Sequence, residues 1–303
     1  MSNATGNELN AFQERCKAIL SEEVVLREGG GPAGHERQRK LGRLPVRERL
    51  TRLLDHPESF LELGLWAGYK MYEAWGDVPA AGVVAGIGEV CDRPCMIIAN
   101  DATVKAGAFF PQTAKKVLRA QRIAFECSLP LVYLVDSAGV FLPLQDEIFP
   151  DEDDFGRIFR NNAVLSAAGI PQYAAIMGNC VAGGAYLPVL CDKILMTEGS
   201  GLYLAGPSLV KAAIGQETDA EELGGAKMHA EISGTIDFNE PIDEACLKRL
   251  RSLIELLPSV LSSPVQLGAG SQSSVPLVGT EKDSLTLDQL IGLDGRKEYD
   301  ARD

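Results

Sequence analysis

The hydrophobic and polar positions of the chain follow two different periods. Apolar residues recur at three- and four-residue steps in 6–27, and 111–128 is amphipathic, which predicts two helices there. Helices are also predicted at 155–168 and 241–257. Short continuous apolar runs predict buried strands at 83–90, 95–100, 131–136, 173–177, 194–197 and 202–204. Two short helices are expected as well, at 45–55 and 182–190.

The order of these elements indicates an α/β protein. Strands 83–90 and 95–100 flank an Asp-Arg-Pro turn and predict a hairpin. From residue 111 onward, short strands alternate with helices, which is typical of a largely parallel sheet covered by helices. Ser, Gly, Pro and Gln dominate from 262 to 276 and predict a linker. We therefore expect an N-terminal helix at 1–27, a domain at 28–261 and a linker at 262–303.

Charge narrows the class of partner. The 303 residues carry a net charge of -13 and are 46% hydrophobic, enough for a sizeable core. An acidic chain argues against nucleic acid and anionic membranes as main partners. No stretch is apolar enough to span a bilayer, and residues 1–14 lack the pattern of a signal peptide. We expect a cytoplasmic protein, with an organelle matrix as the alternative.

Cysteine and histidine give no metal-ligand pattern. The seven cysteines are scattered, and Cys91 and Cys95 have no second pair to complete a zinc site. His35, His56 and His229 are far apart in the sequence. We expect reduced thiols and no bound metal.

Three loops of small residues follow successive predicted strands. The loop at 100–110 contains Lys105, Ala106 and Gly107, and the loop after 131–136 is Ser137-Ala138-Gly139. The turn at 182–185 reads Ala-Gly-Gly-Ala and begins a helix. Paired glycines let a ligand approach the backbone, and a helix start leaves N–H groups unpaired. Because ligands bind beyond the carboxyl ends of parallel strands, the three loops predict one pocket that can hold an oxyanion.

Two basic segments admit two interpretations each. Lys115, Arg119 and Arg122 lie on one face of the predicted helix at 111–128. Residues 37–49 form a second basic segment, which contains several arginines. A solvated face is the favoured interpretation of both, and contact with ligand phosphates is the functional one.

Several motifs of the chain resemble those of a known family. They are Gly42-Arg43-Leu44-Pro45-Val46-Arg47-Glu48-Arg49, the segment 100–105, Leu142-Pro143-Leu144-Gln145-Asp146-Glu147, the segment 155–159, the turn 182–188, Leu204-Ala205-Gly206-Pro207 and the segment 222–226. With them, the chain resembles the carboxyltransferase (β) subunit of biotin-dependent acyl-CoA carboxylases, closest to the methylcrotonyl-CoA and geranyl-CoA carboxylase branch. The resemblance extends from about residue 29 to residue 257.

The resemblance implies a crotonase-like (ClpP/crotonase) ββα-spiral fold and the N-terminal half of a longer subunit. It implies acyl-CoA as the substrate and biotin as the cofactor, carried on a separate biotin carboxylase or biotin carrier subunit. The missing partner would be a C-terminal carboxyltransferase domain, and the assembly a homo-oligomer.

The resemblance also assigns roles to residues. The backbone N–H groups of Gly183 and Gly184 would hold the thioester enolate. The three loops themselves, and not the resemblance, give the expected substrate-binding positions, which are Lys105, Ala106, Gly107, Ser137, Ala138, Gly139, Ala182, Ala185 and Tyr186.

The chain departs from the usual family pattern at a few of these positions. Ala138 and Ala106 stand where the family usually has glycine, Leu144 where the related branch has arginine, and Phe109-Phe110 where a tyrosine pair is usual. These changes predict a more apolar or differently shaped acyl pocket.

Three other functions remain open at this point. A biotin-dependent acyl-CoA decarboxylase would have the same fold and run the transfer in reverse. A crotonase-like hydratase or isomerase would need a carboxylate beside the oxyanion turn, and 182–188 has none. A non-catalytic CoA-binding or assembly domain is the alternative outside enzymes.

Overall fold

The computed structural model describes residues 2–258, with side chains from residue 13 onward. The helices are α1 (Ser2–Arg27), α2 (Gly31–Lys40), α3 (Val46–Leu53), α4 (Pro111–Glu126), α5 (Gln145–Ile148), α6 (Phe155–Ala167), α7 (Tyr186–Val189), α8 (Pro207–Ile214), α9 (Ala220–Gly224), α10 (Ala226–Met228) and α11 (Asp243–Glu255). The strands are β1 (Leu61–Leu63), β2 (Val83–Val90), β3 (Arg93–Asn100), β4 (Leu131–Ser137), β5 (Gln172–Val181), β6 (Lys193–Thr197), β7 (Gly201–Tyr203) and β8 (Phe238–Glu240).

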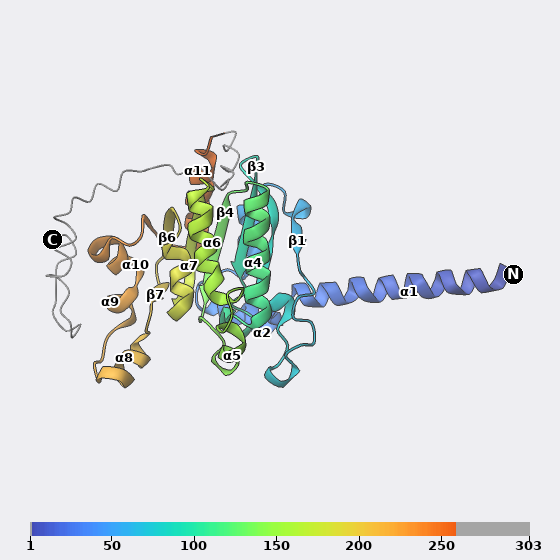
Figure 1. Ribbon diagram of the computed structural model, residues 1–303, viewed down its shortest axis with the longest axis horizontal. Coiled ribbons are helices and arrows are strands. Elements are labelled where there is room, and N and C mark those ends of the chain that lie inside the picture. Colours follow the sequence, from blue (N-terminus) through green and yellow to red (C-terminus); the bar gives the residue numbers. More distant parts are fainter. Residues whose placement is uncertain (1, 259–303) are drawn as a thin grey trace. The chain divides into compact units, whose positions relative to one another are not determined.

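The strands form one mixed sheet. Its order is β1-β2-β3-β4-β5-β6-β8, and β7 pairs with the C-terminal end of β5. The pairs among β1, β2 and β3 are antiparallel, whereas the pairs from β3 to β8 are parallel. Helices connect the parallel strands, as in Figure 1, where α4 and α6 lie side by side in front of β3 and β4. The expected α/β class is confirmed.

Both faces of the sheet are buried. On one face, Ile98, Tyr133 and Ile176 pack with apolar residues of α4 and α6. On the other, Ile97 and Leu134 pack with α3 and α11. Neighbouring residues of one strand face opposite sides, so a strand covered on both faces is apolar throughout. This is why the central strands appear in the sequence as unbroken apolar runs.

Polar segments were harder to predict. α2 has no counterpart among the predicted helices, because its buried positions are Gly34 and Gln38 and it carries no apolar stripe. β5 continues to Val181, beyond the predicted 173–177, because Gly178 and Asn179 interrupt the apolar run. The short helices α8, α9 and α10 were not predicted either.

Two expectations are not settled by the fold. The predicted linker at 262–303 lies outside the described residues, and the division into an N-terminal helix, a domain at 28–261 and a linker stays a prediction. Among the described residues, no helix is both long and apolar enough to cross a membrane.

Candidate active site

The three loops predicted to form a pocket meet at one end of the sheet. A 3₁₀ turn at Lys105–Gly107 follows β3, the segment after β4 begins at Ala138, and a 3₁₀ turn at Ala182–Ala185 follows β5. Because β3, β4 and β5 are parallel neighbours, their carboxyl ends lie together. The sheet therefore positions the loops next to one another.

Hydrogen bonds fix these loops to one another. The Ser137 hydroxyl donates to the carbonyl of Gly107 at 2.7 Å, and the N–H of Ala138 donates to the carbonyl of Ala106 at 3.0 Å. The N–H of Gly139 donates in turn to the Ser137 oxygen at 3.1 Å. Ser137 is buried, so its hydroxyl acts as a bridge between two loops rather than as an exposed nucleophile.

Two glycines allow this close packing. Gly107 has a φ of +68°, and a Cβ there would lie 2.1 Å from the carbonyl oxygen of Asp136. Gly139 has a φ of +88°, and its Cβ would lie 2.8 Å from the carbonyl oxygen of Val181. Both conditions, a left-handed φ and a backbone neighbour, exclude other residues. Contact between loop backbones thus depends on these two positions.

The turn at Ala182–Ala185, the candidate oxyanion turn, begins a short helix after β5. Ala182 adopts a φ of +56°, and Gly183 and Gly184 follow in the first turn of a helix that continues into α7. N–H groups of a first helical turn have no acceptor within the helix. A Cβ on Gly184 would point toward Gly139 Cα at 3.7 Å and Ser137 Oγ at 4.0 Å. The missing side chain therefore lets this turn and the Ser137 loop lie close together, with a gap of about one methyl group between them.

The other predicted substrate-binding residues lie around this centre. Lys105 and Ala106 are exposed, and the Lys105 amine lies beside Gly76, where a Cβ would be 2.7 Å from Nζ. Ala138 and Ala182 are exposed, whereas Ala185 is buried. Tyr186 is exposed, and its ring lies 5.5 Å from that of Phe159. The loops are brought together as expected, and the individual roles stay predictions.

A buried ionic cluster beneath the site was not foreseen. Arg49 is 1% exposed and donates from Nε to Asp243 at 2.8 Å and from Nη1 and Nη2 to Asp136 at 3.4 Å. The Arg43 guanidinium lies 3.7 Å from the other oxygen of Asp136. Burial raises the pKa of Asp136, and the charges of Arg49 and Arg43 oppose that rise. Two arginines and two carboxylates thus balance in charge.

The favoured interpretation of the basic segment 37–49 as a solvated face is wrong for Arg49 and for Arg43, whose side chain is 14% exposed. Arg49 is buried because it lies on the same helix face as Val46, Leu50 and Leu53, which pack under the sheet. That spacing was visible in the sequence. An arginine on an apolar face indicates a buried partner, and the partner, Asp136, is distant in the sequence.

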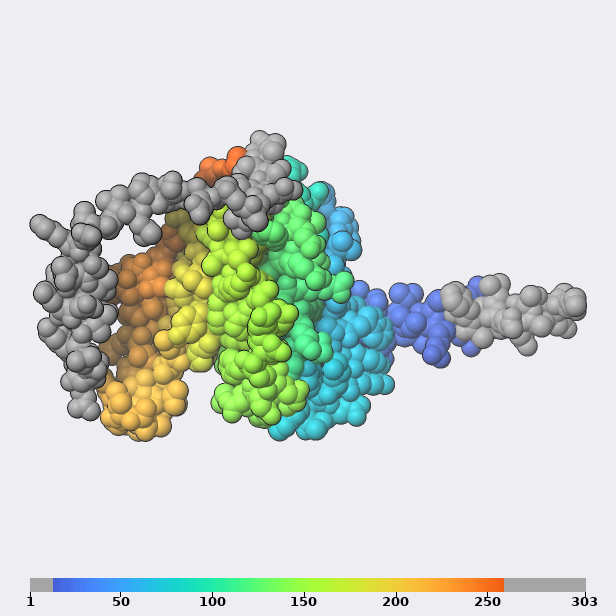
Figure 2. Space-filling model, viewed as in Figure 1, coloured from blue at the N-terminus to red at the C-terminus, as the bar shows by residue number. Residues whose placement is uncertain are grey.

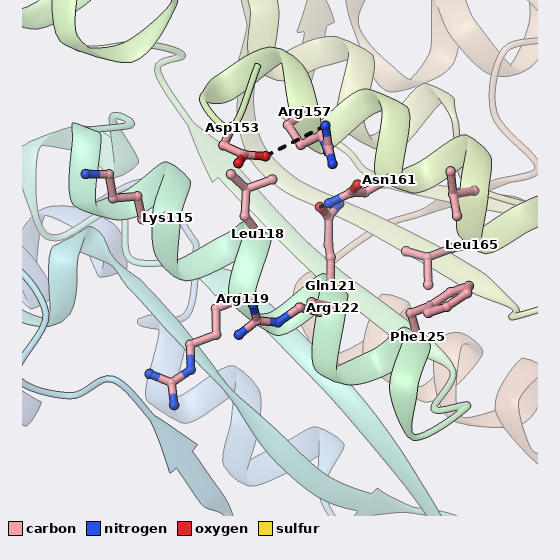
Figure 3. Close-up of a pocket in the computed structure, with 11 residues that line it drawn as sticks. Lys115, Leu118, Arg119, Gln121, Arg122, Phe125, Asp153, Arg157, Asn161 and Leu165 are labelled. Carbon is pink, nitrogen blue, oxygen red and sulfur yellow. Dashed lines mark hydrogen bonds and ion pairs between the residues drawn. The ribbon is translucent and has the colours of Figure 1, made fainter. Parts of the chain in front are cut away.

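The basic stripe of α4 lies away from the loops. Lys115, Arg119 and Arg122 lie at the surface, as the solvated-face interpretation expects. They line a groove of about 600 Å³ between α4 and α6, opposite Arg157 (Figure 3). Both helices lie on the face shown in Figure 2. The predicted pocket residues at 105–107, 137–139 and 182–186 do not line this groove, so contact of the stripe with ligand phosphates stays a prediction.

Among the described side chains, no three His, Cys, Asp or Glu groups converge as metal ligands. The expectation that the chain binds no metal stays a prediction.

Comparison with known proteins agrees with the resemblance found in the sequence. A model of the carboxyl transferase domain matches residues 37–303. The mitochondrial methylcrotonoyl-CoA carboxylase beta chain of Arabidopsis thaliana is 44% identical over 298 residues, which cover 97% of this chain and 49% of that protein. The chain therefore spans about half the length of this curated relative.

Solved structures agree on the fold. The crystal structure of transcarboxylase 12S, with methylmalonyl-coenzyme A and methylmalonic acid bound, matches with a TM-score of 0.74 and 32% identity, over 81% of this chain and 48% of that one. The geranyl-CoA carboxylase beta subunit of P. aeruginosa matches with a TM-score of 0.67 and 35% identity, over 82% and 44%. The expected crotonase-like fold is confirmed. The chain belongs to the carboxyl transferase domain family.

Proposed function

We propose that this chain forms the acyl-CoA side of the carboxyltransferase component of a biotin-dependent acyl-CoA carboxylase. The complete reaction moves a carboxyl group from carboxybiotin to an acyl-CoA through a thioester enolate. The observation that carries the proposal is the meeting of the three loops, with Gly183 and Gly184 in the first turn of a helix and with room for no more than a methyl group between Gly184 and the Ser137 loop.

The chemistry needs little from side chains. When the carbon that will be carboxylated loses its proton, negative charge develops on the thioester oxygen. The N–H groups of Gly183 and Gly184 would stabilise that charge, and the loss of one such donor commonly costs about 3–4 kcal/mol of transition-state stabilisation. The loop at Lys105–Gly107 and the Ser137 loop would hold the thioester against the turn. Carboxybiotin would release its carboxyl group as CO₂, the biotin left behind would accept the proton from the acyl carbon, and the CO₂ would add to that carbon.

The partners follow from the same proposal. Biotin would arrive on a separate biotin carboxylase or biotin carrier subunit, and a C-terminal carboxyltransferase domain would complete the site. We also propose a homo-oligomer, in keeping with transcarboxylase 12S, whose crystal structure is described as a hexamer assembly. The proposed location is the cytoplasm, and the relative from Arabidopsis thaliana, a mitochondrial protein by name, makes an organelle matrix the alternative.

A ligand series tests the proposal on the chain itself. The melting temperature is measured with acetyl-, propionyl-, methylcrotonyl- and geranyl-CoA, with free CoA and with buffer. A ligand that binds the folded state alone raises the melting temperature according to its concentration and Kd. A rise ranked by acyl group supports the proposal and indicates the substrate class. Equal stabilisation by free CoA and by every acyl-CoA supports a non-catalytic CoA-binding domain instead.

Gly184→Ala provides the matched variant. The nearest atom to its new Cβ is at 3.7 Å, an ordinary contact, so the fold is expected to remain. The methyl group would occupy the space proposed for the thioester. Loss of acyl-CoA stabilisation in this variant, with the melting temperature in buffer unchanged, supports the assignment, whereas unchanged acyl-CoA binding contradicts it.

A further inference from the structure

The register between β4 and β5 changes just before the candidate oxyanion turn. Val135 pairs with Ile176, but Ser137 pairs with Cys180. Three residues of β5, at 177–179, therefore stand opposite the single residue Asp136 of β4. Such a bulge leaves backbone groups without ladder partners, and bulges next to active sites re-aim the chain that follows them.

The ionic cluster satisfies the backbone groups of this bulge. Arg49 donates from Nη2 to the carbonyl of Met177 at 2.8 Å, and Asp136 accepts the N–H of Asn179 at 3.2 Å. Gly178, between them, has no room for a side chain, because a Cβ would lie 2.1 Å from the Asp136 carboxyl group. The buried carboxylate thus occupies the space inside the bulge.

The bulge lies directly before the candidate oxyanion turn and beside the Ser137 loop. The turn at Ala182–Ala185 begins two residues after Cys180. The carbonyl of Val181 is packed against Gly139, and Gly184 faces Gly139 and Ser137. A change in the bulge would therefore alter the spacing between the two loops that are proposed to enclose the thioester.

We propose that the buried Arg49–Asp136 pair is a positioning device for the oxyanion turn, because it holds the β5 bulge that sets the register between the Gly183–Gly184 turn and the Ser137 loop. The proposal rests on the function proposed above. Neither side chain is proposed to touch the reacting atoms, so both are positioning residues. Asp243 and Arg43 complete the cluster and neutralise its charge.

The test variant is Asp136→Asn, and Arg49→Lys is the second. Asparagine can still accept the N–H of Asn179, but it removes one of the two carboxylates that face Arg49 and leaves Asp243 as the remaining counter-charge. Lysine keeps the charge, but a single ammonium cannot reproduce the fork that bonds Asp136 and Met177 together. Asp55→Asn is the matched control, since Asp55 also pairs with an arginine, Arg251 at 2.6 Å, and accepts a backbone N–H, that of Asp92 at 2.8 Å, in the β2–β3 hairpin.

The first readout needs no ligand. Hydrogen exchange of peptides covering residues 177–186 is followed by mass spectrometry in all four proteins. We expect at least one of the two test variants to fold and to exchange faster in this segment than the wild type, by about tenfold or more, while the control exchanges there as the wild type does. A folded test variant with wild-type exchange across 177–186 would overturn the proposal.

The second readout isolates the thioester oxygen. Kd is measured for the best-binding acyl-CoA and for its thioether analogue, in which CH₂ replaces the thioester carbonyl. We expect the preference of the wild type for the thioester to fall about fivefold in the test variants, which corresponds to one weakened hydrogen bond, with thioether binding unchanged. A purely structural role would weaken both ligands equally, and that result would overturn the proposal.

The two readouts separate the two proposals. A wild-type chain that binds neither ligand, or both equally, contradicts the proposed function. In that case, hydrogen exchange still decides whether the pair holds the bulge.

Discussion

The substitution Gly107→Ala is expected to destabilise the chain strongly, for reasons that can be summed from the structure. Its φ of +68° costs an alanine about 1 kcal/mol. Its Cβ would lie 2.1 Å from the backbone oxygen of Asp136, and overpacking against such a neighbour costs about 1–3 kcal/mol. Displacement also weakens the hydrogen bond from Ser137, worth about 1 kcal/mol. The total is about 3–5 kcal/mol.

The matched control is Gly169→Ala. Gly169 has nearly the same φ, +74°, but no atom lies within 4 Å of its added Cβ. The φ penalty of about 1 kcal/mol should then be the whole cost. The difference between the two variants, about 2–4 kcal/mol, measures how tightly the loop after β3 is packed against the end of β4.

Urea unfolding followed by circular dichroism gives the free energy of unfolding of each variant. The melting temperature should fall further in Gly107→Ala than in Gly169→Ala, by roughly 4–16 °C for a chain of this size. If the two variants lost the same free energy of unfolding, to within about 0.5 kcal/mol, the loop after β3 would not be packed against the backbone of β4 as described.

Three other predictions concern buried or exposed polar groups. Burial lowers the pKa of Lys116 to about 8 from its usual 10.5, so between these two values the unfolded chain binds more protons than the folded chain. The free energy of unfolding should therefore rise by about 2 kcal/mol from about pH 7.5 to about pH 9.5, relative to the variant Lys116→Met. Equal pH profiles of the two proteins would contradict this prediction. Asn162→Ala should cost about 2–4 kcal/mol in urea unfolding, because the Tyr133 hydroxyl and the carbonyl of Leu187 both lose a buried partner. Arg119→Ala should change the free energy of unfolding by less than about 0.5 kcal/mol and leave CoA affinity unchanged, whereas weaker, salt-dependent CoA binding would favour phosphate contact.

Local patterns in the sequence predicted much of the site. The glycine-containing loops at 105–107, 137–139 and 182–185 each follow an apolar run. A sheet of parallel strands brings such loops together whatever its other details, so their meeting could be expected from the order of strands and loops along the chain. The polar helix α2 and the full length of β5 could not be predicted in this way, because α2 has no apolar stripe and the apolar run of β5 stops before the strand ends.

The sequence by itself determined the α/β order, the small-residue loops and the family resemblance, because these depend on residues that are close along the chain. Tertiary structure alone decided that Arg49 meets Asp136, 87 positions away, inside a bulge of β5. It also decided that Lys116 is buried while its neighbour Lys115 is exposed. The physical reason is that burial and charge pairing depend on which strands and helices become neighbours. That choice is made by the packing of the whole sheet, and no local period encodes it.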